Sequence, residues 1–129
     1  MDVYNLDFYD RLRKDYIKHK SLFVAYDYDN TVYDYHNQGI NYDKIISLLR
    51  VCKSLDFTMI LFTGNEGEKL EVIKKDLKKR DIPYDLINEN PLMPTRKPYY
   101  NILLDDRAGL KEAYNYLKKL TDEIRNKEI

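Results

Sequence analysis

Short apolar runs alternate with amphipathic segments along nearly the whole chain, and this alternation constrains the fold more than any other feature. Four apolar runs predict strands at residues 22–26, 57–62, 84–87 and 101–104. Apolar residues at helical spacing predict helices over residues 5–18, 42–54, 66–80 and 108–120. Strands joined by helices form right-handed crossovers, which make the sheet parallel. We therefore expect an α/β protein with a three-layer α/β/α, Rossmann-like fold and a small parallel sheet of about four strands.

Length and composition suggest one domain spanning residues 1–129. A chain of 129 residues buries roughly two thirds of its unfolded surface without disulfides or metals. Basic and acidic residues balance at 22 each, so no basic field attracts nucleic acid or a membrane over a distance. Cys52 is the only cysteine, which excludes an internal disulfide and fits a reducing, cytoplasmic setting. With neither a signal peptide nor a membrane-spanning run in the sequence, we expect a soluble protein with no membrane partner.

Polar residues stand at the ends of the predicted strands. Asp27 and Asp29 follow the first strand, Thr63 follows the second, Lys97 precedes the fourth, and Asp105 with Asp106 follow it. Each has an ordinary explanation alone, because aspartates start turns, threonine caps helices and loop lysines are solvated. The carboxyl ends of parallel strands meet at one edge of a sheet, where ligands bind. The order of these residues therefore favours a functional site at that edge.

These residue types suit phosphoryl transfer to a carboxylate. Mg²⁺ binds carboxylate oxygens and cancels the repulsion between clustered aspartates. An ionised Asp27 can attack phosphorus and form an aspartyl-phosphate, while Asp29 protonates the leaving oxygen and then activates water. The Thr63 hydroxyl and nearby backbone N–H groups can bind the transferring oxygens, and Lys97 can neutralise the remaining charge. Gly64 and Asn65 follow Thr63 and are candidate substrate-binding residues.

With these residues in place, the chain resembles the haloacid dehalogenase (HAD) superfamily of phosphohydrolases. Motif one, DxDx[TV] after an apolar strand, corresponds to "VAYDYDNTV"; motif two to "MILFTGN"; motif three to "RKP"; motif four to "ILLDDRAG". The resemblance implies that Asp27 is the nucleophile, Asp29 the acid/base, Thr63 the phosphoryl-oxygen donor and Lys97 the stabilising cation. It also implies a Mg²⁺ site made of the Asp27 carboxylate, the Asp29 carbonyl, Asp106 directly and Asp105 through water.

The sequence departs from the family pattern in two ways. Asn30 replaces the usual glycine after the second aspartate, a change that matters little if the turn needs a positive φ, because asparagine tolerates that conformation. Between Thr31 and Tyr42 there is room only for a short flap, so the chain resembles a member without a cap domain. An open site suits a large substrate, or a small one that a neighbouring subunit of a homo-oligomer encloses.

A narrower resemblance concerns nucleic-acid ends. "LLDDR" and "FTGNEG" are similar to polynucleotide 3′-phosphatase domains, which implies that Arg107 helps to bind phosphate. Several tyrosines could then stack on a base, although packing is their ordinary role; they are Tyr28, Tyr33, Tyr35, Tyr99 and Tyr100. Against this reading, Asn65 stands where those domains carry an arginine, and the net charge is zero. Nucleotide ends remain the minority alternative.

The main expectation is a magnesium-dependent phosphatase that hydrolyses a phosphomonoester, and three other readings compete with it. A dehalogenase needs neither Asp29 nor paired acids. A catalytically idle phosphate-binding module is a second alternative, but idle relatives commonly lose a motif aspartate. The basic run at residues 74–80 is a possible nucleic-acid patch, although it reads better as a solvated helix face around Asp76. His36, on the flap, reads as an ordinary loop residue.

Overall fold

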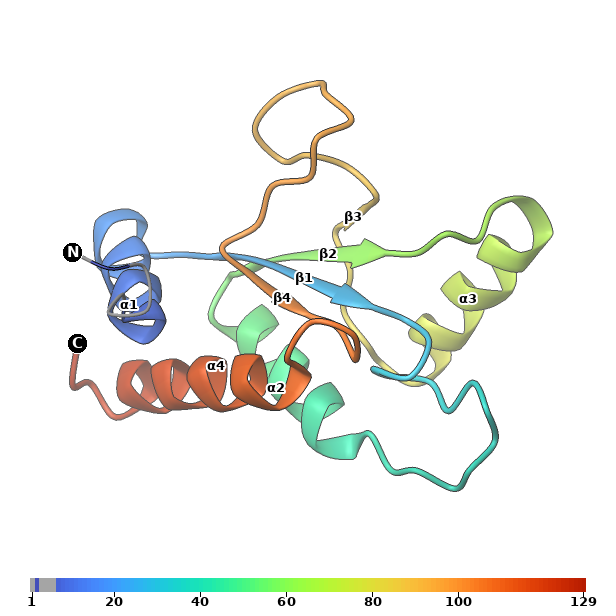
Figure 1. Cartoon of the computed structure of the whole chain (residues 1–129), viewed down its shortest axis with the longest axis horizontal. Coiled ribbons are helices and arrows are strands. Elements are labelled where there is room, and N and C mark those ends of the chain that lie inside the picture. The colour runs from blue at the N-terminus through green and yellow to red at the C-terminus, as the bar shows by residue number, and fades with distance from the viewer. Residues whose placement is uncertain (1, 3–6) are drawn as a thin grey trace.

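The chain alternates helices and strands, as the sequence predicts (Figure 1). A computed structural model describes residue 2 and residues 7–129. Its elements are α1 (Phe8–His19), β1 (Phe23–Asp27), α2 (Asp43–Ser54), β2 (Thr58–Phe62), α3 (Gly67–Lys79), β3 (Leu86–Ile87), β4 (Ile102–Leu104) and α4 (Leu110–Arg125). The Asp7 carboxylate caps α1 by accepting the Asp10 N–H at 3.1 Å. Residues 5 and 6 of the predicted first helix, including Leu6, lie outside the described residues.

The four strands form one parallel sheet in the order β3-β2-β1-β4. Strand β1 is central, and its Ala25 lies opposite Ile60 of β2 and Leu103 of β4. After β3 the chain crosses back over the sheet to place β4 beside β1, so the strand order reverses next to β1. The predicted fold class, a Rossmann-like α/β fold around a small parallel sheet, is confirmed.

Helices α2, α3 and α4 contribute the core on one face of the sheet. Val24 and Tyr26 of β1, together with Leu104 of β4, pack in one cluster with buried side chains of these helices. The Tyr26 hydroxyl is fully buried and donates to the Pro83 carbonyl at 2.8 Å. Cys52 belongs to the same cluster, and its burial raises the pKa of the thiol to about 12, as an unreactive core position requires.

The connecting segment 88–101 lies on the opposite face of the sheet, which it contacts through Tyr99 and Tyr100. Ala25 and Ile60 face this side by strand alternation and are fully buried. Tyr99 packs edge-on against Phe23, and Tyr100 packs similarly against Phe62. The third layer is therefore an aromatic-anchored segment, which Figure 1 shows rising above the sheet, away from α2 and α4.

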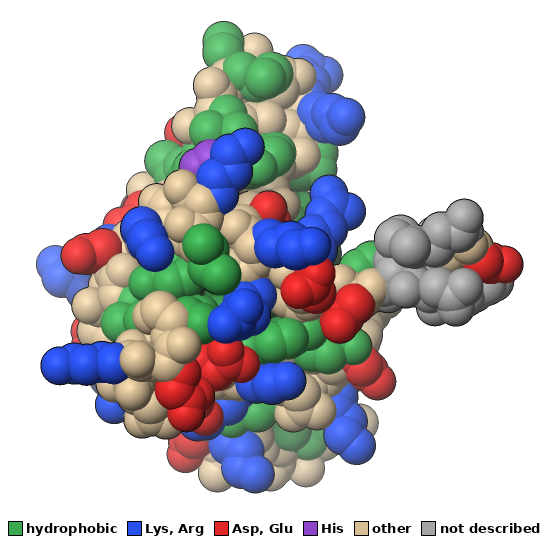
Figure 2. Space-filling view, turned by 90° about the vertical axis from the view of Figure 1, so that its left-hand side faces the viewer, with side chains coloured by type: hydrophobic (Ala, Val, Ile, Leu, Met, Phe, Trp, Pro, Cys, Tyr) green, Lys and Arg blue, Asp and Glu red, His purple; other side chains and the backbone are tan. Residues whose placement is uncertain are grey.

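The described surface carries charges of both signs. Figure 2 shows basic and acidic side chains interspersed on one face of the molecule, consistent with the balanced charge of the sequence. No helix within the described ranges is long and apolar enough to cross a membrane.

Candidate active site

Three carboxylates converge at the carboxyl ends of β1 and β4. The register pairs Tyr26 with Leu104, so the chain reaches Asp27 and Asp105 side by side as the two strands end. Carboxylate oxygens of Asp27, Asp105 and Asp106 lie within 4.8 Å of one another. Sequence separation gives no hint of this proximity; the parallel pairing of β1 with β4 creates it. The three acidic side chains therefore converge, as the sequence predicted.

The clustered charges disfavour ionisation. Burial, followed by the charge of Asp105, raises the pKa of Asp27 to about 6, with smaller contributions from Asp106 and Asp29. Burial also raises the pKa of Asp106, and its hydrogen bond to Asp105 adds to the effect, whereas the Arg107 charge opposes it. Carboxylate oxygens are the donors that hard divalent cations prefer. This donor set therefore fits a cation such as Mg²⁺, which would offset the repulsion.

A tight turn presents Asp29. Asn30 adopts a φ of 57° and donates its N–H to the Tyr33 carbonyl at 2.7 Å. The N–H groups of Val32 and Tyr33 both donate to the Tyr28 carbonyl at 3.1 Å. The turn thus needs the positive φ that asparagine tolerates, as the sequence indicated. Burial raises the pKa of Asp29, and the nearby charge of His36 lowers it, so the flap brings His36 toward the site.

The Thr63 hydroxyl is held in a donating orientation. Its oxygen accepts hydrogen bonds from the Asn65 N–H at 3.1 Å and from the Asn65 side-chain amide at 3.0 Å. A hydroxyl has two lone pairs and one proton, and both lone pairs are engaged here. The Thr63 proton is therefore available to a ligand oxygen, and Asn65 acts by orienting it.

Asn88 is a site residue that sequence reasoning missed. Its side chain accepts the Thr63 N–H at 2.9 Å and donates to the Thr63 carbonyl at 2.8 Å, which fixes the backbone at the end of β2. Asn88 directly follows β3 and has a φ of 53°. The available signal was another polar residue at a strand end, the same signal that identified Thr63.

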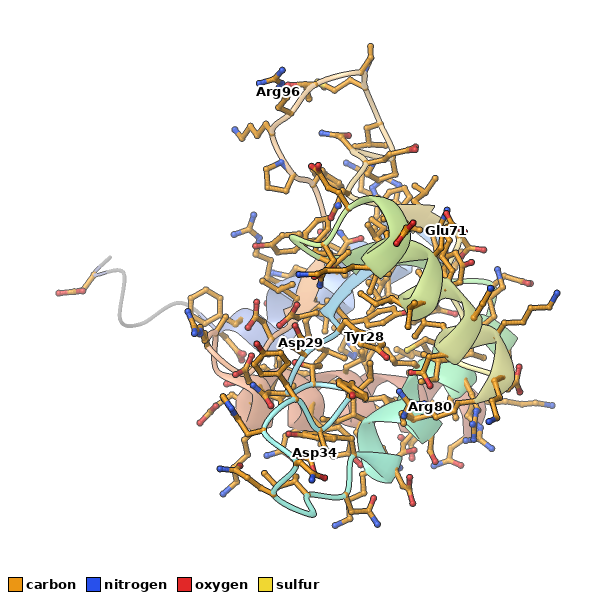
Figure 3. The ribbon with its side chains drawn as sticks, turned by 90° about the vertical axis from the view of Figure 1, so that its right-hand side faces the viewer. Tyr28, Asp29, Asp34, Glu71, Arg80 and Arg96 are labelled. Atoms are coloured by element: carbon orange, nitrogen blue, oxygen red, sulfur yellow. The ribbon has the colours of Figure 1, made fainter. Side chains whose placement is uncertain are left out.

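The remaining predicted site residues are Gly64, Lys97 and Arg107, of which Arg107 donates its N–H to the Asp105 carboxylate at 2.9 Å. Gly64 is exposed, and a Cβ there would meet nothing within 4 Å, which leaves room for a ligand. Lys97 lies on segment 88–101, where its N–H donates to Thr95 at 3.3 Å. Among the described side chains, no ion pair joins the Lys97 ammonium to a carboxylate. Figure 3 shows the adjacent Arg96 at the outer end of this segment, far from Asp29. The roles of Lys97 and Arg107 stay predictions.

An ion-pair network ties the Asp29 turn to α3; two of its members, Tyr28 and Arg80, are labelled in Figure 3. The buried Tyr28 donates its hydroxyl to Asp76 at 2.5 Å. Arg80 donates to both oxygens of Asp76, at 3.0 Å and 2.5 Å, and to the Val32 carbonyl at 2.9 Å. The interpretation of residues 74–80 as a solvated face is therefore wrong for Asp76 and Arg80, which are half-buried because they pair across to the turn.

Removing Arg80 is expected to loosen this turn. We predict that Arg80→Ala lowers the free energy of unfolding by about 1–3 kcal/mol, because the Val32 carbonyl loses its Arg80 donor and Asp76 keeps only the Tyr28 hydroxyl. Arg80→Lys should recover only part of this, since an ammonium lacks the planar fork. The matched control is Arg50→Ala, which also removes hydrogen bonds to backbone carbonyls but on an exposed surface. Urea unfolding measures both, and equal losses for the two alanine variants would contradict the prediction.

The flap between β1 and α2 is organised by Asp34. Its carboxylate accepts the N–H groups of Gln38, Gly39 and Ile40 at 3.1, 2.7 and 3.2 Å. These bonds, led by that of Gln38, lower the pKa of Asp34. One carboxylate satisfying three backbone donors closes the loop on itself without a helix or strand.

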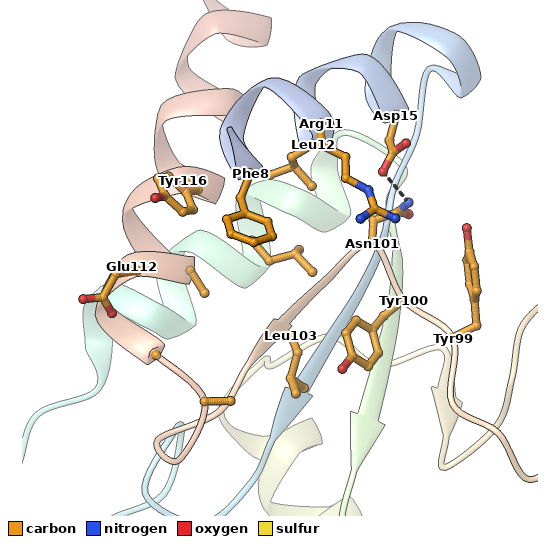
Figure 4. A pocket seen from close by; sticks show the side chains of 14 residues that line it. Phe8, Arg11, Leu12, Asp15, Tyr99, Tyr100, Asn101, Leu103, Glu112 and Tyr116 are labelled. Atoms are coloured by element: carbon orange, nitrogen blue, oxygen red, sulfur yellow. Dashed lines mark hydrogen bonds between the residues drawn. The ribbon is translucent and has the colours of Figure 1, made fainter. Parts of the chain in front are cut away.

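A cavity of about 640 Å³ is lined by residues on both sides of the Asp105–Arg107 segment, among them Leu103 and Ala108 (Figure 4). It separates α1 from β4 and the start of α4, and Phe8, Leu103 and Tyr116 are among its walls. None of the predicted catalytic residues lines it.

Comparison with known proteins informs the fold alone. No protein-family model and no curated protein matches the sequence. A conserved protein from Bacteroides thetaiotaomicron has a similar solved structure, with a TM-score of 0.61 and 20% sequence identity over 83% of this chain and 92% of that chain. The similarity supports the α/β architecture described above.

Proposed function

We propose that this chain is a magnesium-dependent phosphatase of the HAD type, which hydrolyses a phosphomonoester through an aspartyl-phosphate on Asp27. The observation that carries the proposal is the convergence of Asp27, Asp105 and Asp106 within 4.8 Å at the carboxyl edge of the sheet. Three clustered carboxylates can be ionised at the same time only if a cation offsets their repulsion, and the same cation can bind the oxygens of a phosphate. The motif resemblance supports the same chemistry. A cytoplasmic location and a covering homo-oligomer stay predictions.

The proposed reaction has two displacements. An ionised Asp27 oxygen attacks phosphorus, the bond from phosphorus to the leaving oxygen breaks, and Asp29 gives its proton to that oxygen. Asp29 then takes a proton from water, whose oxygen attacks phosphorus and releases inorganic phosphate from Asp27. The free Thr63 proton binds a transferring oxygen throughout. Mg²⁺, held by Asp27, Asp105 and Asp106 with the Asp29 carbonyl, would supply positive charge for the phosphoryl oxygens.

A phosphatase screen with metal control tests the proposal. We expect release of phosphate from p-nitrophenyl phosphate and from members of a phosphomonoester panel in the presence of Mg²⁺. EDTA should lower the rate by roughly a hundredfold or more, and added Mg²⁺ should restore it. Absence of turnover across the whole panel would refute the proposal, and tight binding of a phosphorylated ligand in that case would favour an idle phosphate-binding module.

Binding of the metal has a readout that does not need activity. A ligand that binds only the folded state stabilises it by about 2.7 kcal/mol at a hundred times its Kd. We expect Mg²⁺ to raise the melting temperature of the wild type, and a variant with Asp105 and Asp106 both changed to asparagine to show no such rise.

A further inference from the structure

A second cavity lies directly beside Asp29. Its volume is about 550 Å³, and it separates the flap from α3. Asp29 and Asn65 stand at the catalytic end, whereas Tyr33 and Tyr35 line the flap side and Val72 lines the α3 side. This volume lies within the range of small-molecule sites, roughly 300–1,000 Å³.

Five of the nine residues that line the cavity are aromatic or aliphatic, and several of them face solvent. The rings of Tyr28 and Tyr33 stack with centroids 5.1 Å apart and planes at 14°. Tyr33 is 43% exposed, Tyr35 61% and Val72 66%. The Tyr28 hydroxyl donates to Asp76, and this bond fixes the ring on which Tyr33 stacks. Clustered exposed apolar side chains beside a catalytic group are typical of a ligand-binding surface.

The position of the cavity identifies which part of a substrate it faces. In an in-line displacement the nucleophile and the leaving group lie on opposite sides of phosphorus. Asp29, the proposed proton donor to the leaving oxygen, lines the cavity, whereas Asp27 and the motif-four acids do not. The cavity therefore lies on the leaving-group side of the site.

We infer that this cavity selects phosphomonoesters whose alcohol carries a flat aromatic ring, either a nucleobase or a simple aryl group. The inference rests on the proposed phosphatase function and adds its substrate class. A flat ring can stack on the tyrosines while Val72 contacts its other side, and stacking on an aromatic side chain is tolerant of ring identity. Lys69 and Asn65, which also line the cavity, offer donors to a polar ring edge.

Two matched substrate pairs test this inference with the full chain and Mg²⁺. Adenosine 5′-monophosphate and ribose 5-phosphate share the same primary phosphate ester and differ in the base. Benzyl phosphate and cyclohexylmethyl phosphate differ in whether the ring is flat. We expect kcat/KM to favour the aromatic member by about tenfold or more. A preference in the first pair alone identifies a nucleobase as the recognised ring. A preference in the second pair alone identifies a simple aryl group, and a preference in both pairs shows that any flat ring is recognised.

Variants connect the preference to the cavity. Tyr35→Leu, and independently Val72→Glu, should each reduce the preference by about fivefold or more. Both side chains are exposed, so both variants should fold. The matched control is Tyr116→Leu on α4, an exposed tyrosine of the other cavity, which should keep the wild-type preference. Measuring kcat/KM for both pairs with each variant completes the experiment.

Two failures are distinguishable. Equal hydrolysis of both members in both pairs, or a preference that neither variant changes, would overturn the aromatic assignment and leave the phosphatase function standing. No magnesium-dependent hydrolysis of any phosphomonoester would overturn both.

Discussion

An Asp27→Asn variant is expected to lose at least about a thousandfold in phosphatase turnover and to become more stable. The activity falls because an amide is too weak a nucleophile to attack phosphorus. Stability should rise because Asp27 is half-buried beside Asp105 and Asp106, where its charge is unfavourable without a cation. The combination excludes misfolding as the reason for lost activity.

The sign of the stability change follows from the pKa of Asp27. Burial and the neighbouring acids raise it from 3.8 to about 6 in the folded state. Between these two values the folded state binds more protons than the unfolded state, so stability falls as pH rises through this window and stays lower above it. The Asp27→Asn substitution removes this loss of folding stability, which we expect to be about 1 kcal/mol at pH 7 after solvent screening is considered.

Urea unfolding at pH 3.5 and pH 7, with EDTA present, measures this effect. The wild type and the variant should differ more at pH 7 than at pH 3.5. Asp56→Asn is the matched control, because Asp56 is exposed and has a φ of 63° that asparagine adopts readily. This control should keep the wild-type turnover and pH dependence. A destabilised Asp27→Asn protein would argue that the carboxylate is paired favourably in the folded state.

The sequence predicted the features that depend on periodicity and strand ends. Apolar runs located all four strands, and the parallel order then brought Asp27 and Asp105 to one edge. The ends of two elements differ from the prediction. Helix α4 continues to Arg125 rather than ending at 120, because Thr121 and Ile124 extend its inward face. Strand β3 keeps only Leu86–Ile87 in the ladder, although residues 84–87 were predicted.

The contacts that position the site could not be predicted from one sequence. Asn88 is hydrogen-bonded to the backbone of Thr63, 25 residues away in sequence, and Arg80 donates to the Val32 carbonyl, 48 residues away. Such pairs depend on where the chain returns after each crossover, which hydrophobic periodicity does not encode. Asp76 illustrates the difficulty, because a charge within a basic helix normally faces water. Here Tyr28, which stands between Asp27 and Asp29, donates its hydroxyl to Asp76.

The second large effect concerns Asp29 and depends on the leaving group. An Asp29→Asn variant should hydrolyse benzyl phosphate about a hundredfold to ten-thousandfold more slowly, because an alkoxide leaves poorly without a proton donor. p-Nitrophenolate leaves without protonation, so the first displacement with p-nitrophenyl phosphate should change by less than about tenfold. The two substrates thus separate proton donation from every other role of the site.

With Asp29→Asn and p-nitrophenyl phosphate, the second displacement can then be measured separately from the first. In the proposed mechanism Asp29 also activates the attacking water, so the variant should release about one nitrophenolate per chain in a burst and then turn over slowly. Rapid-mixing absorbance measures the burst, and acid quenching followed by mass spectrometry should find phosphate on Asp27. Thr63→Val provides the contrast. The proposed role of the Thr63 proton, binding a transferring oxygen, does not depend on the leaving group, so both substrates should slow alike. If Asp29→Asn also slowed both substrates equally in the first displacement, Asp29 would be a metal or structural residue rather than the proton donor.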